Sequence, residues 1–263
     1  MKKILFGFLI ISTLFSCQKE IDVDLNEVNP QVVIEANYTA EDSTVRVRIS
    51  LTSNYFDTAP SETVNNAVVT ITDMLGASQN IISKGNGEFE LLNYIPLFNT
   101  TYTLNVAYNG TNYSAQCDMK IPVDLNDITF EYFPSFFGGD DGYLSHLNFQ
   151  DPAEAGNRYL VLITRNGVVK DKVYNFILQD DKFTNGNLIE RPLFIDSLFN
   201  SGDVIGMELR SIDDKIFYYY SELISISSGQ SSAAPANPEN NWDNKALGYF
   251  SAYSNSRKEA IVP

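Results

Sequence analysis

The fold class is decided by the stretch YTLNVAYNGTNYSAQCDM, residues 102–119. Apolar and polar residues alternate on both sides of Asn109-Gly110, and an Asn-Gly pair between alternating runs is the strongest short signal of a β-hairpin. Cys117 falls on the apolar face of the second strand, which indicates a core thiol and not a nucleophile. The sequence therefore predicts two antiparallel strands joined by a tight turn.

Similar alternation surrounds this hairpin. Further strands are predicted at residues 31–37, 44–49, 67–72 and 88–92, with turn residues between them. Several short strands separated by turn signals are typical of a β-sandwich. We therefore expect an N-terminal sandwich of immunoglobulin or transthyretin type over residues 31–122.

A second β-rich domain with one packed helix is predicted for residues 123–263, so the whole fold is mainly β. Its strands are expected at 128–133, 143–149, 159–164, 168–178, 204–209 and 246–253. Residues 213–227 form the one convincing helix, because apolar residues recur there at helical spacing. Ser211 or Asp213 can cap its start.

The beginning of the chain carries an export signal. Lys2 and Lys3 precede the apolar run Ile4–Phe15, which is typical of a secretory signal peptide and shorter than the roughly 20 residues of a membrane span. The cysteine that follows resembles the acylated residue of a bacterial lipoprotein signal, and an ordinary secretory signal is the alternative. We expect residues 1–16 to be the signal peptide, Cys17 the lipidation site, and residues 17–30 an acidic tether.

Composition narrows the range of partners. The chain has 18 Lys and Arg against 33 Asp and Glu, a formal net charge of −15. Such a chain repels nucleic acid and anionic lipid headgroups, so we expect neither as a partner. Cys17 and Cys117 are the only cysteines, so the fold is expected to hold without disulfides.

No motif for catalysis or metal binding stands out. His146 is the only histidine, and no Gly-x-Ser-x-Gly elbow, phosphate loop or dinucleotide fingerprint accompanies it. Residues 138–142 form an acidic loop whose oxygens could hold calcium, but the ligand spacing of an EF-hand is missing. Acidic pairs occur at Asp140-Asp141, Asp180-Asp181 and Asp213-Asp214. Adjacent strand residues point to opposite faces, so we expect no enzyme, no cofactor and no metal site.

One aromatic segment suggests a contact surface. Phe136 and Phe137 precede Asp140 and Asp141 in a predicted loop. They are either core residues or exposed anchors for a partner, in which case the two aspartates would orient it. Trp242 leaves the same two alternatives open.

A set of segments also occurs in a distinctive order. These are PQVVIE at 30–35, SNYFD at 53–57, VNNAVVTI at 64–71, DDKFTNG at 180–186, GDV at 202–204, PANP at 235–238 and ALGYFSA at 246–252. Together they resemble an uncharacterised Bacteroidota outer-membrane lipoprotein family, domain of unknown function 4249. The resemblance implies an accessory lipoprotein encoded beside SusC-like TonB-dependent barrels, and it implies no catalytic residues.

Two shorter patterns agree with the resemblance to Bacteroidota lipoproteins. Gln18-Lys19-Glu20 with Asp22 resembles the surface-export signal of Bacteroidota lipoproteins, which implies a lipid-anchored protein facing the cell exterior. Ser43, Thr58 and Ser197 each follow an aspartate, and these sites resemble the Bacteroidota O-glycosylation motif.

The function expected from these observations is that of a non-enzymatic, surface-exposed outer-membrane lipoprotein. It would bind a SusC-like barrel in nutrient uptake or in the assembly of envelope proteins. A stand-alone lipoprotein that binds a glycan or peptide is the first alternative. A surface hydrolase using acidic residues or His146 is the second.

Overall fold

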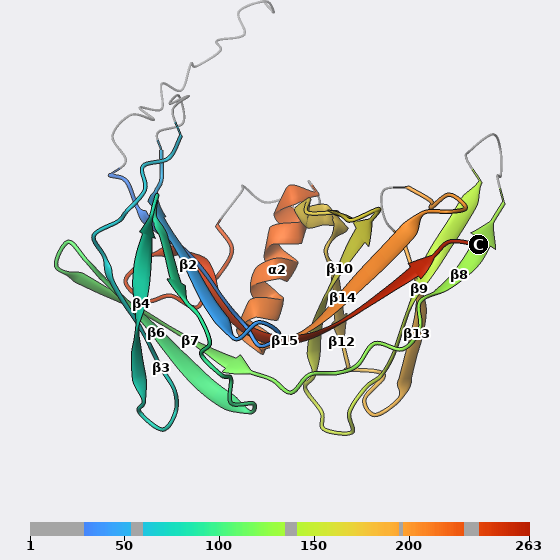
Figure 1. Cartoon of the computed structure of the whole chain (residues 1–263), viewed down its shortest axis with the longest axis horizontal. Helices are drawn as coiled ribbons and strands as arrows, with labels where there is room; N and C mark the ends of the chain where they lie inside the picture. The colour runs from blue at the N-terminus through green and yellow to red at the C-terminus, as the bar shows by residue number, and fades with distance from the viewer. Residues whose placement is uncertain (1–28, 54–59, 135–140, 195–196, 229–236) are drawn as a thin grey trace, which may run out of the picture.

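The computed structural model describes residues 29–53, 60–134, 141–194, 197–228 and 237–263 (Figure 1). The fold is mainly β, as predicted, with one α-helix in the described residues. A large mixed sheet has 12 strands and a small sheet has 3.

The first half of the chain forms a two-layered sandwich. Its strands are β1 Val32–Thr39, β2 Thr44–Leu51, β3 Val68–Thr72, β4 Ser78–Gly85, β5 Glu88–Leu91, β6 Thr100–Tyr108 and β7 Thr111–Met119. They pair in the order β1-β2-β5-β4-β3-β6-β7. β4 belongs to both layers, because its first residues pair with β3 and its last with β5. The register of the β4–β5 pairing shifts between Ser83 and Gly85.

The predicted hairpin is present as β6 and β7. Asn109 and Gly110 have φ angles of 47° and 76°, as a two-residue hairpin turn requires. The alternate residues of both strands face the interior, and Cys117 is buried there as predicted. Trp242 closes this core, and its Nε1 donates a hydrogen bond to the Ile34 carbonyl oxygen at 3.1 Å.

The second half has three layers: a helix, a part of the large sheet, and the small sheet. Its elements are β8 Thr129–Phe133, β9 Gly142–Gln150, β10 Arg158–Arg165, β11 Val168–Val169, the 3-10 helix η1 Val173–Asn175, β12 Ile177–Asp180, β13 Leu188–Leu193, β14 Val204–Ile212, α2 Asp214–Ser227 and β15 Leu247–Ile261. The small sheet has the order β13-β9-β8.

The sequence of β10 is apolar without alternation because both faces of this strand are buried. Val161 and Ile163 pack toward the small sheet, in one core with Phe149. Leu160 and Leu162 belong to the other core, with Ile216 and Tyr220 of α2. A strand buried on both faces needs apolar residues at every position.

The helix confirms the prediction for residues 213–227. Asp213 is its N-cap, and the side chain accepts a hydrogen bond from the Ile216 amide at 2.9 Å. Such a bond satisfies one of the amides that a helix start leaves unpaired. α2 therefore begins where the sequence indicates.

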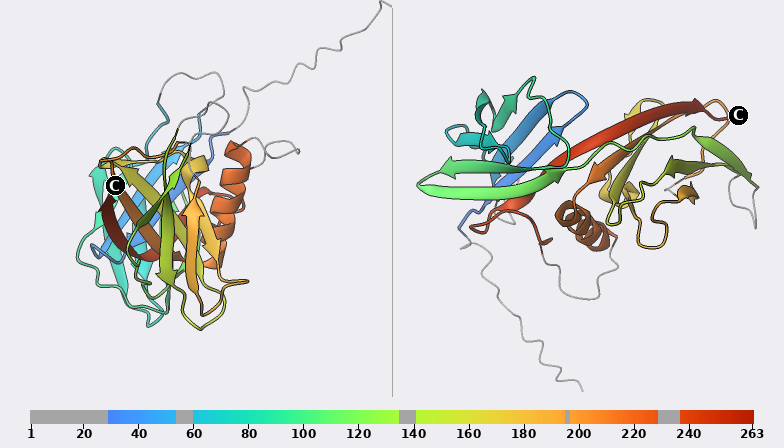
Figure 2. Two further views of the ribbon diagram at one scale, coloured as in Figure 1. Left: turned by 90° about the vertical axis from the view of Figure 1, so that its right-hand side faces the viewer. Right: turned by 90° about the horizontal axis from the view of Figure 1, so that it is seen from below.

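Two strand predictions need correction. The strand expected over 168–178 is broken, because β11 has only two residues and η1 follows before β12. The strand expected over 246–253 is β15, which continues to Ile261. Its first half runs parallel to β1 and its second half antiparallel to β14, so the large sheet passes through both halves of the molecule (Figure 2).

Candidate functional site

Large apolar side chains are exposed together at one end of the first sandwich. We call this surface the apolar end, and it consists of Met74, Leu75, Leu92, Ile95, Leu97 and Phe98. Leu75 and Ile95 are the most open, with exposed fractions of 79% and 78%. Single exposed apolar residues are ordinary, but a contiguous group of them marks an interaction surface.

The strand pairing brings these residues together. β3 and β6 are neighbours, with Thr72 opposite Thr103. The turn at 73–77 leaves the end of β3, and the loop at 92–99 leads into the adjacent start of β6. The Asp73 carboxylate accepts the amides of Leu75 and Ala77 at 2.9 Å each, which fixes the turn.

A cluster of three tyrosines, Tyr38, Tyr94 and Tyr102, fixes the backbone of the 92–99 loop. The Tyr38 hydroxyl donates to the Tyr94 carbonyl oxygen at 2.6 Å, and the Leu97 amide donates to the Tyr102 hydroxyl at 2.7 Å. The rings of Tyr38 and Tyr94 stack at 5.4 Å. Burial raises the pKa of Tyr94 to about 12, and the nearby Asp73 and Tyr102 add to the shift. The loop therefore presents its apolar side chains from a fixed backbone.

The apolar end lies away from the start of the described chain. β1 begins at Val32, close to residue 29, and ends at Thr39 next to the residue that stacks on Tyr94. At roughly 3.3 Å per residue, its eight residues span about 26 Å. Figure 1 shows the first described residues and the loops of the apolar end at opposite ends of this sandwich.

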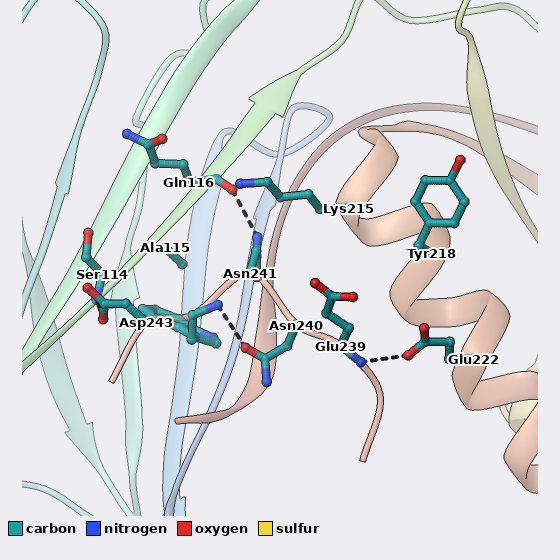
Figure 3. Close-up of a pocket in the computed structure, with 11 residues that line it drawn as sticks. Ser114, Ala115, Gln116, Lys215, Tyr218, Glu222, Glu239, Asn240, Asn241 and Asp243 are labelled. Carbon is teal, nitrogen blue, oxygen red and sulfur yellow. Dashed lines mark hydrogen bonds between the residues drawn. The ribbon is translucent and has the colours of Figure 1, made fainter. Parts of the chain in front are cut away.

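A second candidate site is a polar hollow of about 610 Å³, which we call the β7–α2 pocket (Figure 3). Its walls come from residues 114–116 of β7, from Lys215, Tyr218 and Glu222 of α2, and from residues 239–243. This volume is in the range of small-molecule sites, about 300–1,000 Å³.

The segment 239–243 covers the outer edge of β7. The Asp243 amide donates to the Ser114 carbonyl oxygen at 3.0 Å, and the Ser114 amide donates back to the Asp243 carboxylate at 2.7 Å. Asn241 adds a bond from its side-chain amide to the Gln116 carbonyl oxygen at 3.0 Å. These bonds place Trp242 in the core, which decides between the two alternatives that its sequence context left open.

Several predicted site residues lie outside the described residues: Cys17, Thr58, Phe136, Phe137 and Asp140. Asp141 is described, and its carboxylate accepts a hydrogen bond from the Tyr132 hydroxyl at 2.6 Å. Tyr132 and Phe133 of β8, at the edge of the small sheet, are themselves exposed.

The two remaining glycosylation candidates are both near the surface. Ser43 lies in the β1–β2 turn with a positive φ of 52° and is half-buried. Ser197 is exposed, and its hydroxyl accepts a bond from the Arg165 guanidinium at 3.4 Å. Phe199, two residues after Ser197, pairs with Tyr143, two residues after Asp141, whereas Ser43 lies in the first half of the fold.

The polar residues considered for catalysis have structural partners. His146 Nε2 lies 3.2 Å from a carboxylate oxygen of Glu131 on the neighbouring strand. Asp181 is buried, and it accepts the amides of Gly156 and Asn157 at 2.6 and 2.8 Å. Among the described residues, no group of three or more His, Cys, Asp or Glu could hold a metal ion.

In the ranges that the structure covers, no helix has both the length and the apolar character to cross a bilayer.

These features define a mainly β protein with one packed helix, an apolar end and a polar pocket. The chain matches the family described as domain of unknown function (DUF4249) over residues 18–259, and it belongs to that family. The resemblance to domain of unknown function 4249 is thus confirmed. No curated protein matches the chain.

Proposed function

We propose that this protein is a surface-exposed outer-membrane lipoprotein and a non-enzymatic accessory subunit of a SusC-like TonB-dependent barrel. Its role would be in nutrient uptake or in the assembly of envelope proteins. The observation that carries the proposal is the apolar end. Six large apolar side chains, held on a fixed loop and a fixed turn, form a surface suited to a protein partner.

The tether is long enough to bring this surface to a partner in the same membrane. The 14 residues from 17 to 30 reach at most about 50 Å when extended. This reach exceeds the ~26 Å length of β1. The body can therefore turn its apolar end toward a barrel beside its own lipid anchor.

Charge favours a protein partner over the lipid surface. The chain has a net charge of −15, and a strongly negative body is repelled by anionic headgroups. Burial of one large apolar side chain at an interface contributes roughly 1.5–3 kcal/mol. Leu75 and Ile95 are the most exposed members of the surface and have the most area to bury.

The test is co-purification from detergent-solubilised membranes of the native host, with partners identified by mass spectrometry. We expect a Leu75→Ser, Ile95→Ser double variant to lose the barrel while keeping the thermal unfolding midpoint within a few degrees. The matched control is Ile82→Ser with Phe183→Ser, two exposed apolar residues outside the apolar end, and it should retain the barrel. Equal barrel recovery with both double variants would contradict the proposal.

The contact predicted for Phe136, Phe137, Asp140 and Asp141 stays a separate prediction. The exposure of Tyr132 beside Asp141 is compatible with it. A Phe136→Ser, Phe137→Ser variant in the same co-purification decides it. A normal fold with full barrel recovery would remove this loop from the interface.

A further inference from the structure

We propose that the β7–α2 pocket binds a neutral oligosaccharide. The proposal goes beyond the accessory role, because this pocket is formed by residues that do not belong to the apolar end. It depends on three features of the pocket: rigid walls, polar groups that the fold leaves unused, and an open aromatic ring.

The wall formed by 239–243 is rigid because its amide side chains are engaged in the fold. Asn240 donates to the Ala246 carbonyl oxygen at 3.0 Å and accepts the Trp242 amide at 2.9 Å. Asn241 donates to the Phe250 carbonyl oxygen at 2.7 Å and accepts the Phe250 amide at 3.0 Å. A pocket whose walls are fixed before binding loses less conformational entropy when a ligand enters.

The groups left for a ligand come mainly from α2 and Glu239. Within the described chain, Lys215 forms no ion pair and the Glu239 carboxylate accepts no hydrogen bond. One oxygen of Glu222 accepts the Glu239 amide at 2.7 Å, and the other oxygen remains. Figure 3 shows Lys215 extending from the helix toward Gln116 and Glu222 beside the Glu239 amide, and Tyr218 also lines the pocket. These groups supply both donors and acceptors around one hollow.

This combination suits the chemistry of a sugar. Each hydroxyl group of a sugar donates and accepts, so it can pair with a carboxylate on one side and an ammonium on the other. The apolar C–H face of a pyranose ring needs a flat surface, and Tyr218 offers a ring with an exposed fraction of 56%. A short stretch of glycan chain fits a hollow of about 610 Å³.

Two other ligand classes fit less well. An extended peptide gains affinity by pairing with an open strand edge, but residues 241–243 already occupy the edge of β7 here. An anionic ligand meets the carboxylates of Glu222, Glu239 and Asp243 with only Lys215 to balance them. The pocket therefore selects against acidic sugars and phosphates.

The test uses the full-length protein in detergent and a panel of purified neutral oligosaccharides: maltoheptaose, cellohexaose, xylohexaose, laminarihexaose and mannohexaose. Binding is measured by calorimetry and by the shift of the unfolding midpoint. We expect at least one sugar to bind, and Tyr218→Ala and Glu239→Gln each to weaken that binding by about tenfold or more. The matched control is Tyr174→Ala, which removes another exposed tyrosine, outside the pocket, and should leave the affinity unchanged.

Each other outcome overturns the proposal. No binding by any sugar of the panel, or binding that Tyr218→Ala and Glu239→Gln leave intact, excludes a neutral glycan site here. Binding of a lysine-rich peptide or of spermine in place of every sugar assigns the pocket to cations. The pocket variants leave the apolar end intact, so barrel recovery in the co-purification assay reports separately on the proposed accessory role.

Discussion

The carboxylate of Asp213 is buried in this acidic chain and accepts hydrogen bonds from two different elements. Asp213 has an exposed fraction of only 7% and connects two elements. It caps α2 through the Ile216 amide and also accepts the Asp118 amide of β7 at 3.3 Å. Burial raises the pKa of this carboxyl above its ordinary value of 3.8, although the hydrogen bonds act in the opposite direction.

This shift predicts a pH dependence of stability. A raised pKa means that the folded state holds the proton more tightly than the unfolded state, so the contribution of Asp213 is fully present below pH 3.8 and is lost as pH rises through the folded pKa. In Asp213→Asn the cap is kept and the titration is removed. We therefore expect the free energy of unfolding of the wild type, relative to Asp213→Asn, to fall as pH rises above 3.8 and through the raised folded pKa.

Urea unfolding of both proteins at several pH values measures this difference. Asp118 and Lys215, which face the same region, are present in both proteins, so the difference isolates Asp213. Asp213→Ala serves as the comparison that loses the cap, at a cost of about 1 kcal/mol relative to Asp213→Asn at every pH. A difference between wild type and Asp213→Asn that does not change with pH would show the charged form to be fully compensated in the fold.

Single residues differ in how far the sequence can predict them. The cap at Asp213 and the buried Cys117 follow from local patterns, helical spacing in one case and alternation in the other. Trp242 follows from neither, because it lies in a polar run and its partner, the Ile34 carbonyl oxygen, is 208 residues away in the chain. Local sequence does not contain the information that would place it.

Among the elements, β15 depends on one glycine. Gly248 has a φ of 93°, and a Cβ built on it would lie 2.2 Å from the Ile34 carbonyl oxygen. That carbonyl belongs to β1, which runs parallel to β15 at this point. Only glycine allows both the backbone conformation and the close approach.

Gly248→Ala is therefore expected to destabilise the protein by about 3 kcal/mol or more, since strain and overlap add. The matched control is Gly110→Ala in the β6–β7 turn, where φ is 76° and no atom lies within 4 Å of the new Cβ. The control should cost only about 1–2 kcal/mol. Free energies of unfolding in urea give both values, and equal losses would mean that the backbone of β1 shifts to accept the methyl group.

The same strand shows where sequence patterns become uninformative. Residues 254–261 of β15 pair with β14, yet Ser256, Arg257 and Lys258 show no apolar alternation. The backbone ladder with β14 forms the strand there, and Arg257 lies 3.2 Å from both Glu41 and Glu208. The predicted strand 168–178 fails for another reason. β11 and β12 both pair with β10, but after the Lys170 amide donates to the Ile163 carbonyl oxygen the chain forms η1 before the pairing resumes.

At the scale of the whole molecule, β15 joins the two halves of the fold through one continuous sheet. Its first residues pack in the core of the first half, with Phe250 and Ala252, and Ala260 near its end packs against the core of the second. The apolar end and the β7–α2 pocket are thereby carried on one framework. The sequence predicts the strands of this framework, but the non-local pairing of β1 with β15 that positions both sites has no local signal.

The apolar end and the proposed lipid anchor also differ in how far the sequence alone predicts them. The apolar end combines a turn and a loop that are separated in sequence, and its exposed residues look like core residues until the pairing of β3 with β6 is known. The proposed lipid anchor, by contrast, depends on a linear signal in the sequence. Its consequence can be predicted from the sequence alone.

The proposed anchor predicts how the protein distributes between membrane and solution. Cys17→Ala should move the protein from the washed membrane fraction to the soluble fraction, because stable attachment takes more than one acyl chain and none is added without the thiol. The acidic body, with a net charge of −15, provides no electrostatic substitute. Cys117→Ala is the matched control, since the buried thiol has no part in anchoring and this variant should remain in the membrane. Fractionation with a high-salt wash, together with the mass of the mature chain, measures both, and a processed Cys17→Ala protein that stays in the washed membranes would show that a protein partner alone holds it there.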